Sequence, residues 1–306
     1  MVNLSVIICT HNPRDDYFAR TLAALAAQTL GHEAWELLIV DNRSDAPVAG
    51  RFDLGWRPDV RIVREEKLGL TPARLRGIRE AAGELLVFVD DDNLLDPDFL
   101  ESARRIAAER PWLGAWSGQC RPEFENQPEE WTRRYWGNLA IRLFDHDVWS
   151  NLPRLSATMP CGTGLCVRKV VATEYLRLND EGFRRFQLDR SGNSLLSGGD
   201  NDLAACACNL GLGVGLVSAL KLVHIIPNGR LTVDYLARLG EGIAFSSIIL
   251  DRIWGLPTER RSALGKLADR IRILRLKPPH RQILRTTYRG RDRALAMLSA
   301  DKLEEF

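Results

Sequence analysis

The sequence is poor in the features that define secreted, membrane-spanning and nucleic-acid-binding proteins. Its 306 residues include six cysteines without a C-x-x-C pair or a regular framework, which argues against a disulfide scaffold and favours a reducing compartment. No apolar run approaches the roughly 20 residues that span a bilayer. Asn3 and Ser5 interrupt any secretory hydrophobic region at the start. A net charge of +2 argues against a chain-wide nucleic-acid role. We therefore expect a cytoplasmic protein with no nucleic-acid partner.

The first hundred residues alternate between short apolar runs and segments with helical spacing. The runs are rich in β-branched residues and typical of buried strands, whereas the helical segments carry Pro near a start or Gly at an end. The expected strands cover 4–9, 35–40, 60–64 and 85–89, and the expected helices cover 16–30 and 72–83. This alternation predicts an α/β fold, a mostly parallel sheet flanked by helices on both faces.

Polar residues follow each predicted strand. They are Thr10-His11-Asn12, Asp41-Asn42, Arg64-Glu65 and Asp90-Asp91-Asp92-Asn93. In open parallel sheets, ligands bind beyond the carboxyl ends of the strands. The sequence therefore predicts a polar, largely acidic binding site at that edge of the sheet.

The pattern changes after residue 100. Five of the eight tryptophans fall within 112–149. Further strands are expected at 214–217 and 220–226, and the chain reads as helical from Leu231 onward. We expect one large domain over 1–230 and a helical, basic extension over 231–306.

Four segments in order resemble a known family: "SVIICTHN", "LLIVDNRSD", "GLTPARLRGIREAAGELLVFVDDDN" and "SGGDNDL". Together they resemble the inverting glycosyltransferases of family 2, which have the GT-A fold. The resemblance implies a nucleotide-sugar donor, a divalent metal, and a single displacement that inverts the anomeric centre. It covers roughly residues 3–226 and implies that the domain over 1–230 binds a nucleotide-sugar and is catalytic. The tryptophans within 112–149 would then either stack on sugar rings or pack a variable substructure.

The acidic triplet at 90–92 needs a compensating charge, because three adjacent carboxylates repel one another. In an extended segment Asp90 and Asp92 would point to one side and Asp91 to the other. The resemblance assigns Asp92 to Mg²⁺ or Mn²⁺ and puts Asp90 and Asp91 near the ribose or the metal. His224 is a further candidate ligand or a core residue. The alternative for the triplet is an acidic cap of the next helix.

The resemblance also indicates a nucleotide site. Asp41 is expected to accept a hydrogen bond from the imide of uracil or thymine, or to form an Asx turn, and the two roles are compatible. Thr10, His11 and Asn12 are expected to line the nucleotide pocket. Arg74, in the family's "ARN"-like pattern, is expected to bind the nucleotide end of the donor; its alternative is a solvated helical charge.

The catalytic base is expected in "SGGDNDL". Inverting transfer needs a carboxylate that takes the proton of the acceptor hydroxyl. Alignment on the family's G-E-D-x-D-L pattern makes Asp200 the base, but Gly199 replaces the Glu, so Asp202 remains a second candidate. Either aspartate could instead cap the helix that follows. Gly162 and Gly164 are expected to form the floor of the donor-sugar or acceptor site.

Two other functions are compatible with the residues. A sugar nucleotidyltransferase also uses acidic metal ligands on an α/β sheet, but "CTHNPRDD" lacks its Gly-rich basic loop. A non-catalytic nucleotide-sugar-binding or assembly module is the second. Residues 251–306 hold 14 Lys and Arg against 7 Asp and Glu, which suggests a peripheral contact with the inner membrane face and a lipid-linked acceptor. The alternative is an appendage packed on the catalytic domain or on a second subunit of a homodimer.

Overall fold

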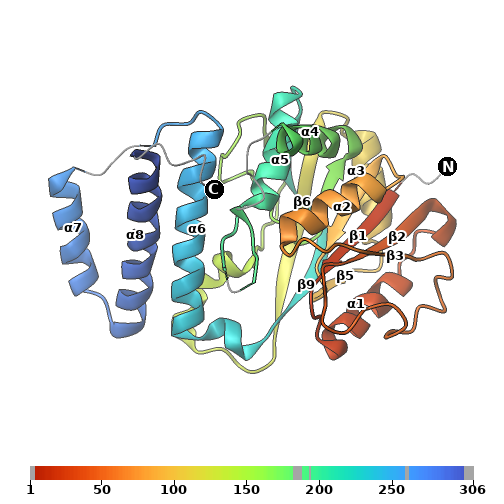
Figure 1. The fold of residues 1–306 in the computed structure, drawn as a ribbon, viewed down its shortest axis with the longest axis horizontal. Helices are drawn as coiled ribbons and strands as arrows, with labels where there is room; N and C mark the ends of the chain where they lie inside the picture. Colours follow the sequence, from red (N-terminus) through yellow and green to blue (C-terminus); the bar gives the residue numbers. More distant parts are fainter. Residues whose placement is uncertain (1–3, 182–187, 193, 259–261, 300–306) are drawn as a thin grey trace. The chain divides into compact units, whose positions relative to one another are not determined.

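The computed structural model describes residues 4–181, 188–192, 194–258 and 262–299 (Figure 1). The chain divides into two compact units. Unit 1 contains Met1–Glu123, Ala140–Phe186 and Gly199–Ile226, and unit 2 contains Phe124–Leu139, Gln187–Gly198 and Pro227–Phe306. The predicted division into a domain over 1–230 and an extension over 231–306 stays a prediction.

A nine-stranded sheet forms the centre of unit 1. Its order is β3-β2-β1-β4-β8-β6-β9-β5, with β7 paired to β9. The strands are β1 Leu4–Thr10, β2 Trp35–Asp41, β3 Arg61–Arg64, β4 Leu85–Val89, β5 Asn93–Leu95, β6 Leu113–Phe124, β7 Val148–Ser150, β8 Leu165–Arg168 and β9 Gly213–Ile226. The strands β3, β2, β1 and β4 pair in parallel, as the alternation of strands and helices predicts, and β8 then pairs antiparallel with β4.

Helices cover both faces of this sheet (Figure 1). The helices of unit 1 are α1 Asp15–Ala26, α2 Leu70–Glu80, α3 Phe99–Glu109, α4 Lys169–Asp180 and α5 Gly199–Asn209. The face that carries Val6 and Ile8 packs with Phe18 of α1 and Phe99 of α3 in the main core. The other face meets α2, because a Cβ built on Gly77 would lie 2.6 Å from Ile7 Cγ2. The predicted α/β class with helix-flanked sheet is confirmed.

Two consecutive basic residues bind the carboxyl ends of helices on opposite faces of the sheet. Arg168 Nη2 donates to the carbonyls of Ala107 and Arg110, at 2.6 and 3.1 Å, where α3 ends. Lys169 Nζ donates to the carbonyls of Ile78 and Ala81, both at 2.7 Å, where α2 ends. These cations satisfy carbonyls that have no partner within their helix and complement the helix dipole.

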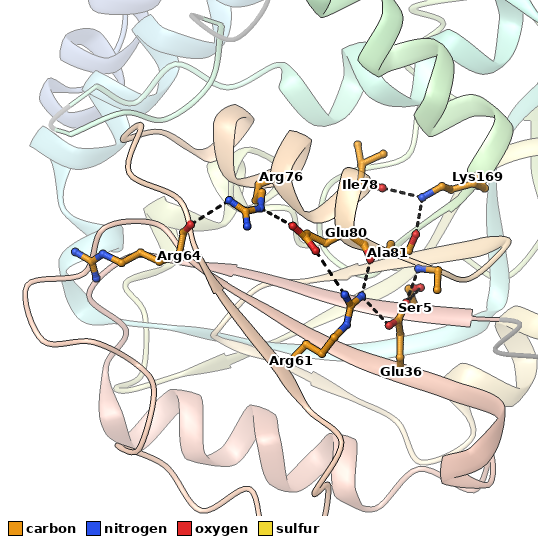
Figure 2. Close-up of polar contacts among 10 residues, drawn as sticks. Ser5, Glu36, Arg61, Arg64, Arg76, Ile78, Glu80, Ala81 and Lys169 are labelled. Carbon is orange, nitrogen blue, oxygen red and sulfur yellow. Dashed lines mark hydrogen bonds and ion pairs between the residues drawn. The ribbon is translucent and has the colours of Figure 1, made fainter.

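A polar network closes the amino-terminal edge of the sheet (Figure 2). Glu36 Oε1 accepts from Ser5 Oγ and from the Ala82 amide, both at 2.6 Å, and Oε2 accepts from Arg61 Nη2 at 2.9 Å. Arg61 also reaches Glu80 of α2. Ser5 and Glu36 are register partners on β1 and β2, so the network ties the first two strands to the end of α2.

Unit 2 is mainly helical. It contains α6 Val233–Ile253, α7 Ala263–Leu274 and α8 Pro278–Ser299, with the 3₁₀ helices η2 Glu130–Leu139 and η4 Asn228–Leu231. Its core joins Leu188, Phe245, Ile249, Leu250 and Ala294. The predicted helical C-terminal region is therefore confirmed. Within the described ranges, no helix combines the length and the apolar character that crossing a membrane requires.

The structure differs from the sequence-based expectation in three elements. Residues 214–217 and 220–226 belong to one continuous strand, β9, instead of two. The long strand β6 was not predicted, because Gly, Ser, Gln, Arg and Pro interrupt its apolar pattern. Helix α1 ends at Ala26 and the chain turns before the 3₁₀ helix η1 His32–Ala34, so the helix stops short of Gly31.

Candidate active site

The predicted polar edge exists where the parallel strands end. Thr10 is the register partner of Asp41, and Asp41 is the register partner of Arg64. Thr10 Oγ1 donates a short hydrogen bond to Asp91 Oδ2, in the loop that follows β4. Residues from β1, β2, β3 and the β4 loop therefore meet at one edge, as parallel pairing requires.

Asp41 is buried and its carboxylate is already engaged. Oδ1 accepts from the Ser44 amide at 2.8 Å, and Oδ2 accepts from the Val48 amide at 3.2 Å and from Arg64 Nη1 at 3.3 Å. Burial acts to raise the pKa of Asp41, but the hydrogen bonds and the Arg64 charge outweigh it, and the pKa is lowered. The carboxylate binds amides three and seven residues on, whereas an Asx turn would bind the amide two residues on. A carboxylate has about four acceptor positions, and the three hydrogen bonds leave room for one more. The nucleobase role of Asp41 stays a prediction.

Two asparagines shape the loops around Asp41. Asn12 has a positive φ of 50°. Its Nδ2 donates to Asp45 Oδ2 at 2.9 Å, and its Oδ1 accepts from the Asp45 backbone amide at 2.8 Å. Asn42 donates to the carbonyls of Glu65 and Lys67 and accepts from the Gly69 amide at 2.7 Å. His11 Nδ1 lies 2.8 Å from the Asn42 carbonyl oxygen. Asn42 thus connects the loop after β1, the loop after β3 and the start of α2.

Asn42 and Arg64 were predicted as members of the polar edge but without a role of their own. The parallel register, which makes Arg64 the partner of Asp41, supplies that role for Arg64.

The acidic triplet adopts a turn, so the expected extended geometry is wrong. The Asn93 amide donates to the Asp90 carbonyl at 3.1 Å, and β5 starts at Asn93. A turn replaces the alternation of side chains that an extended segment would give. Because β5 separates the triplet from α3, whose N-cap is Asp98, the helix-cap alternative is also wrong.

Asp92 and His224 lie together at this turn. Asn93 is the register partner of His224 in the β5–β9 pair, and this register leaves His224 Nε2 3.4 Å from Asp92 Oδ2. Both side chains are buried. Searched across the described ranges, the structure contains no group of three or more His, Cys, Asp or Glu side chains that could hold a metal ion. The pair offers one carboxylate oxygen and one imidazole nitrogen, and the metal role of Asp92 and His224 stays a prediction.

Asp200 lies at the start of α5 and contacts the predicted glycine loop. Its Oδ2 accepts from the Gly162 amide at 2.7 Å. A Cβ built on Gly162 would lie 3.0 Å from Arg74 Nη2 and 3.3 Å from Asp200 Oδ2. Arg74 is only 4% exposed, so the solvated-charge alternative for Arg74 is wrong. The structure therefore brings Arg74, Gly162 and Asp200 together.

The remaining two candidates are more enclosed. Asp202 is 1% exposed, in the first turn of α5. Gly164 has a φ of +63°, and a Cβ built there would lie 2.6 Å from Leu222 Cδ2 and 2.9 Å from Phe99 Cζ. This glycine makes room for core packing, and its place in a substrate floor stays a prediction.

The fold and the edge of the sheet define the class of protein. A parallel half-sheet followed by antiparallel strands, with an acidic turn after β4, is the arrangement expected of a GT-A enzyme. Residues 5–160 match the glycosyl transferase family 2. The chain belongs to this family, which confirms the resemblance seen in the sequence.

Several relatives share this region. The chain is 29% identical over 143 residues, 44% of each protein, to the glucosyl-dolichyl phosphate glucuronosyltransferase of Haloferax volcanii. It is 36% identical over 104 residues to the validoxylamine A glucosyltransferase of Streptomyces hygroscopicus subsp. limoneus, covering 32% of this chain and 22% of that protein. The chain thus spans less than half the length of these curated relatives.

Solved structures share the fold. The crystal structure of residues 1–349 of S. aureus TarS in complex with UDP-GlcNAc superposes with a TM-score of 0.54 at 17% identity, over 94% of this chain and 72% of that one. At this identity the likeness shows the fold alone.

Proposed function

We propose that the protein is an inverting glycosyltransferase that moves a sugar from a nucleoside-diphosphate donor, preferably UDP-linked, to a glycan or lipid-linked acceptor. The observation that carries this proposal is the position of Asp200, a partly exposed carboxylate held on the Gly162 amide beside Arg74. A base must reach the acceptor hydroxyl, and the burial of Asp202 makes Asp200 the better candidate.

Asp200 takes the proton as the bond to the sugar forms. The acceptor oxygen attacks C1 of the donor sugar, the bond between C1 and the diphosphate oxygen breaks, and the proton of the acceptor hydroxyl passes to Asp200. Attack from the side opposite the leaving group inverts the configuration at C1. The Gly162 amide orients Asp200 through the 2.7 Å hydrogen bond, which holds the carboxylate for the transfer.

A divalent cation fits the acidic turn. Asp92 and His224, whose donor atoms lie 3.4 Å apart, would hold Mg²⁺ or Mn²⁺, with Asp90 as a further candidate ligand. When bound, the ion supplies positive charge that neutralises the diphosphate leaving group. Asp91 is held by Thr10 and is assigned to the ribose or metal surroundings.

The nucleotide is assigned to the ends of β1 and β2. Asp41 would accept from the imide of the base, Thr10, His11 and Asn12 would line the pocket, and Arg74 would bind the nucleotide end of the donor. UDP is preferred because a carboxylate acceptor complements an imide N–H, and because TarS, a structure of similar fold, was solved with UDP-GlcNAc. The localisation in the cytoplasm, membrane contact and homodimer formation are parts of the same proposal.

Transfer assays with single substitutions test the base. The purified protein is incubated with UDP-, GDP- and dTDP-sugars and Mn²⁺, and release of the nucleoside diphosphate is measured with and without acceptors. Asp200→Asn should keep donor binding and lose about 10²- to 10⁴-fold in transfer rate. Asp234→Asn, an exposed aspartate in the first turn of α6, is the matched control and should leave the rate unchanged.

Three other outcomes would change the assignment. A wild-type rate for Asp200→Asn would move the base to Asp202. Donor binding without turnover on any acceptor would favour the non-catalytic binding module, which the Gly at position 199 keeps open. Turnover of a nucleoside triphosphate with a sugar phosphate would favour the nucleotidyltransferase.

A further inference from the structure

Helix α7 carries an apolar stripe that the described part of the chain leaves exposed. The exposed fractions are 79% for Leu264, 53% for Leu267, 43% for Ile271 and 66% for Leu274, and the helix contains no buried residue. At 3.6 residues per turn these four side chains fall within an arc of about 80°. The opposite side, with Gly265, Asp269 and Ile273, is half-buried.

The helix is nevertheless well formed at both ends. Ser262 Oγ accepts from the Gly265 amide at 3.1 Å as the N-cap. Arg281 Nη2 donates to the carbonyls of Leu274 and Leu276, at 3.1 and 3.0 Å, beyond the last turn. The caps stabilise α7 as a helix. The described residues, however, provide no surface that buries its four large apolar side chains.

The charged residues beside the stripe indicate what kind of surface would cover it. Lys266 and Arg270 border the stripe on one side and Arg272 on the other, and all three are exposed. The one acidic residue of the helix, Asp269, lies on the half-buried side. Over residues 262–299 the sequence has ten Lys and Arg against two Asp. An apolar stripe between cationic rows is the pattern of a helix that lies in the surface of an anionic bilayer.

We propose that the α7 face formed by Leu264, Leu267, Ile271 and Leu274, with its flanking cations, docks on the surface of an anionic phospholipid membrane. The stripe enters the boundary between headgroups and acyl chains, and the cations contact lipid phosphates. A second copy of the chain is the less favourable occupant, because pairing two such faces brings like-charged rows together. The proposal deepens the proposed function by naming the surface that would bring the enzyme to a lipid-linked acceptor.

Vesicle co-sedimentation tests this docking without any donor or acceptor. The full chain should bind phosphatidylcholine vesicles that contain phosphatidylglycerol, should bind pure phosphatidylcholine about tenfold or more weakly, and should lose binding as salt rises. Leu267→Ser with Ile271→Ser should reduce the partition coefficient by about tenfold or more. Lys266→Gln with Arg270→Gln should do so specifically for anionic vesicles.

Controls keep the test independent of folding and catalysis. Val170→Ser removes an apolar side chain of α4 that is 54% exposed and should leave vesicle binding unchanged. Circular dichroism checks that each variant folds. Wild-type vesicle binding by the Leu267→Ser, Ile271→Ser variant would overturn the proposal. The proposal would also be overturned if the wild type did not bind vesicles but formed an oligomer that the same substitutions dissociate. A failure of glycosyl transfer would leave the vesicle result standing, so the two proposals can fail separately.

Discussion

Replacing Glu36 tests whether the polar network at the amino-terminal edge of the sheet stabilises the fold without contributing to the active site. Glu36→Gln keeps an oxygen that can accept from Ser5 and Ala82, but its NH₂ group faces Arg61. Because Arg61 is 41% exposed, solvent screens that ion pair, and we expect a loss of about 1 kcal/mol in the free energy of unfolding. Glu36→Ala also leaves the Ala82 amide and the Ser5 hydroxyl without their acceptor, so the expected loss is about 3–4 kcal/mol.

Urea unfolding followed by circular dichroism measures both losses, with the m-value as a check on two-state behaviour. Glu130→Gln, an ion-paired glutamate whose side chain is 87% exposed, is the matched control and should change the unfolding free energy by less than about 0.5 kcal/mol. Donor binding by the folded Glu36→Gln variant should be unchanged, because the site is expected at the opposite edge. A Glu36→Ala variant that loses less than about 1 kcal/mol at an unchanged m-value would refute the reasoning.

Three further substitutions or treatments probe the site and its surroundings. Gly162→Ala should lower the transfer rate about tenfold with little loss of stability, because the new Cβ would lie 3.0 Å from Arg74 Nη2. The control Gly229→Ala, whose new Cβ would have nothing within 4 Å, should change neither the rate nor the stability. Equal transfer rates for the two variants would contradict this prediction. Burial favours the neutral form of Asp41, but its hydrogen bonds lower the pKa below the ordinary 3.8. Its stabilisation is therefore present above that pH and lost as pH falls through the lower folded pKa. Asp41→Asn should flatten the acid limb of a plot of urea midpoint against pH, and an unchanged limb would contradict the assignment. Burial raises the pKa of the Cys208 thiol to about 11, so peptide-level mass spectrometry should find its alkylation at pH 8 about a hundredfold slower than in urea; similar rates would count against that environment.

The parallel half of the sheet was predictable because its strands are short, apolar and close in sequence. β1, β2 and β4 read directly from runs of Leu, Val and Ile. Since parallel neighbours end at the same edge, the meeting of Thr10 and Asp41 also followed from the pattern alone.

The second half depends on pairings between distant residues. β6 contains Gly114, Gly118 and Pro122 and has little strand signal of its own, but it is placed between β8 and β9. Tertiary pairing overrides weak local propensity in such strands. The same limit hid the contact between Asp92 and His224, because it arises from the register of β5 against β9.

The burial of Arg74 could not be inferred either. A charge within a helical pattern most often faces solvent, whereas Arg74 is buried next to Gly162, which lies far from it in the sequence. The choice between Asp200 and Asp202 likewise needed the exposure of each side chain, since both occupy the first turn of α5.

The adjacent cations Arg168 and Lys169 have a consequence for synthesis of the chain on the ribosome. The family match ends at residue 160, before the dipeptide that caps α2 and α3 and before β8, which covers the outer side of β4. A nascent chain that has emerged only as far as the match would expose an unpaired strand edge and two uncapped helix ends. The edge of β4 and the ends of α2 and α3 therefore gain these partners once residues 165–169 have left the ribosome.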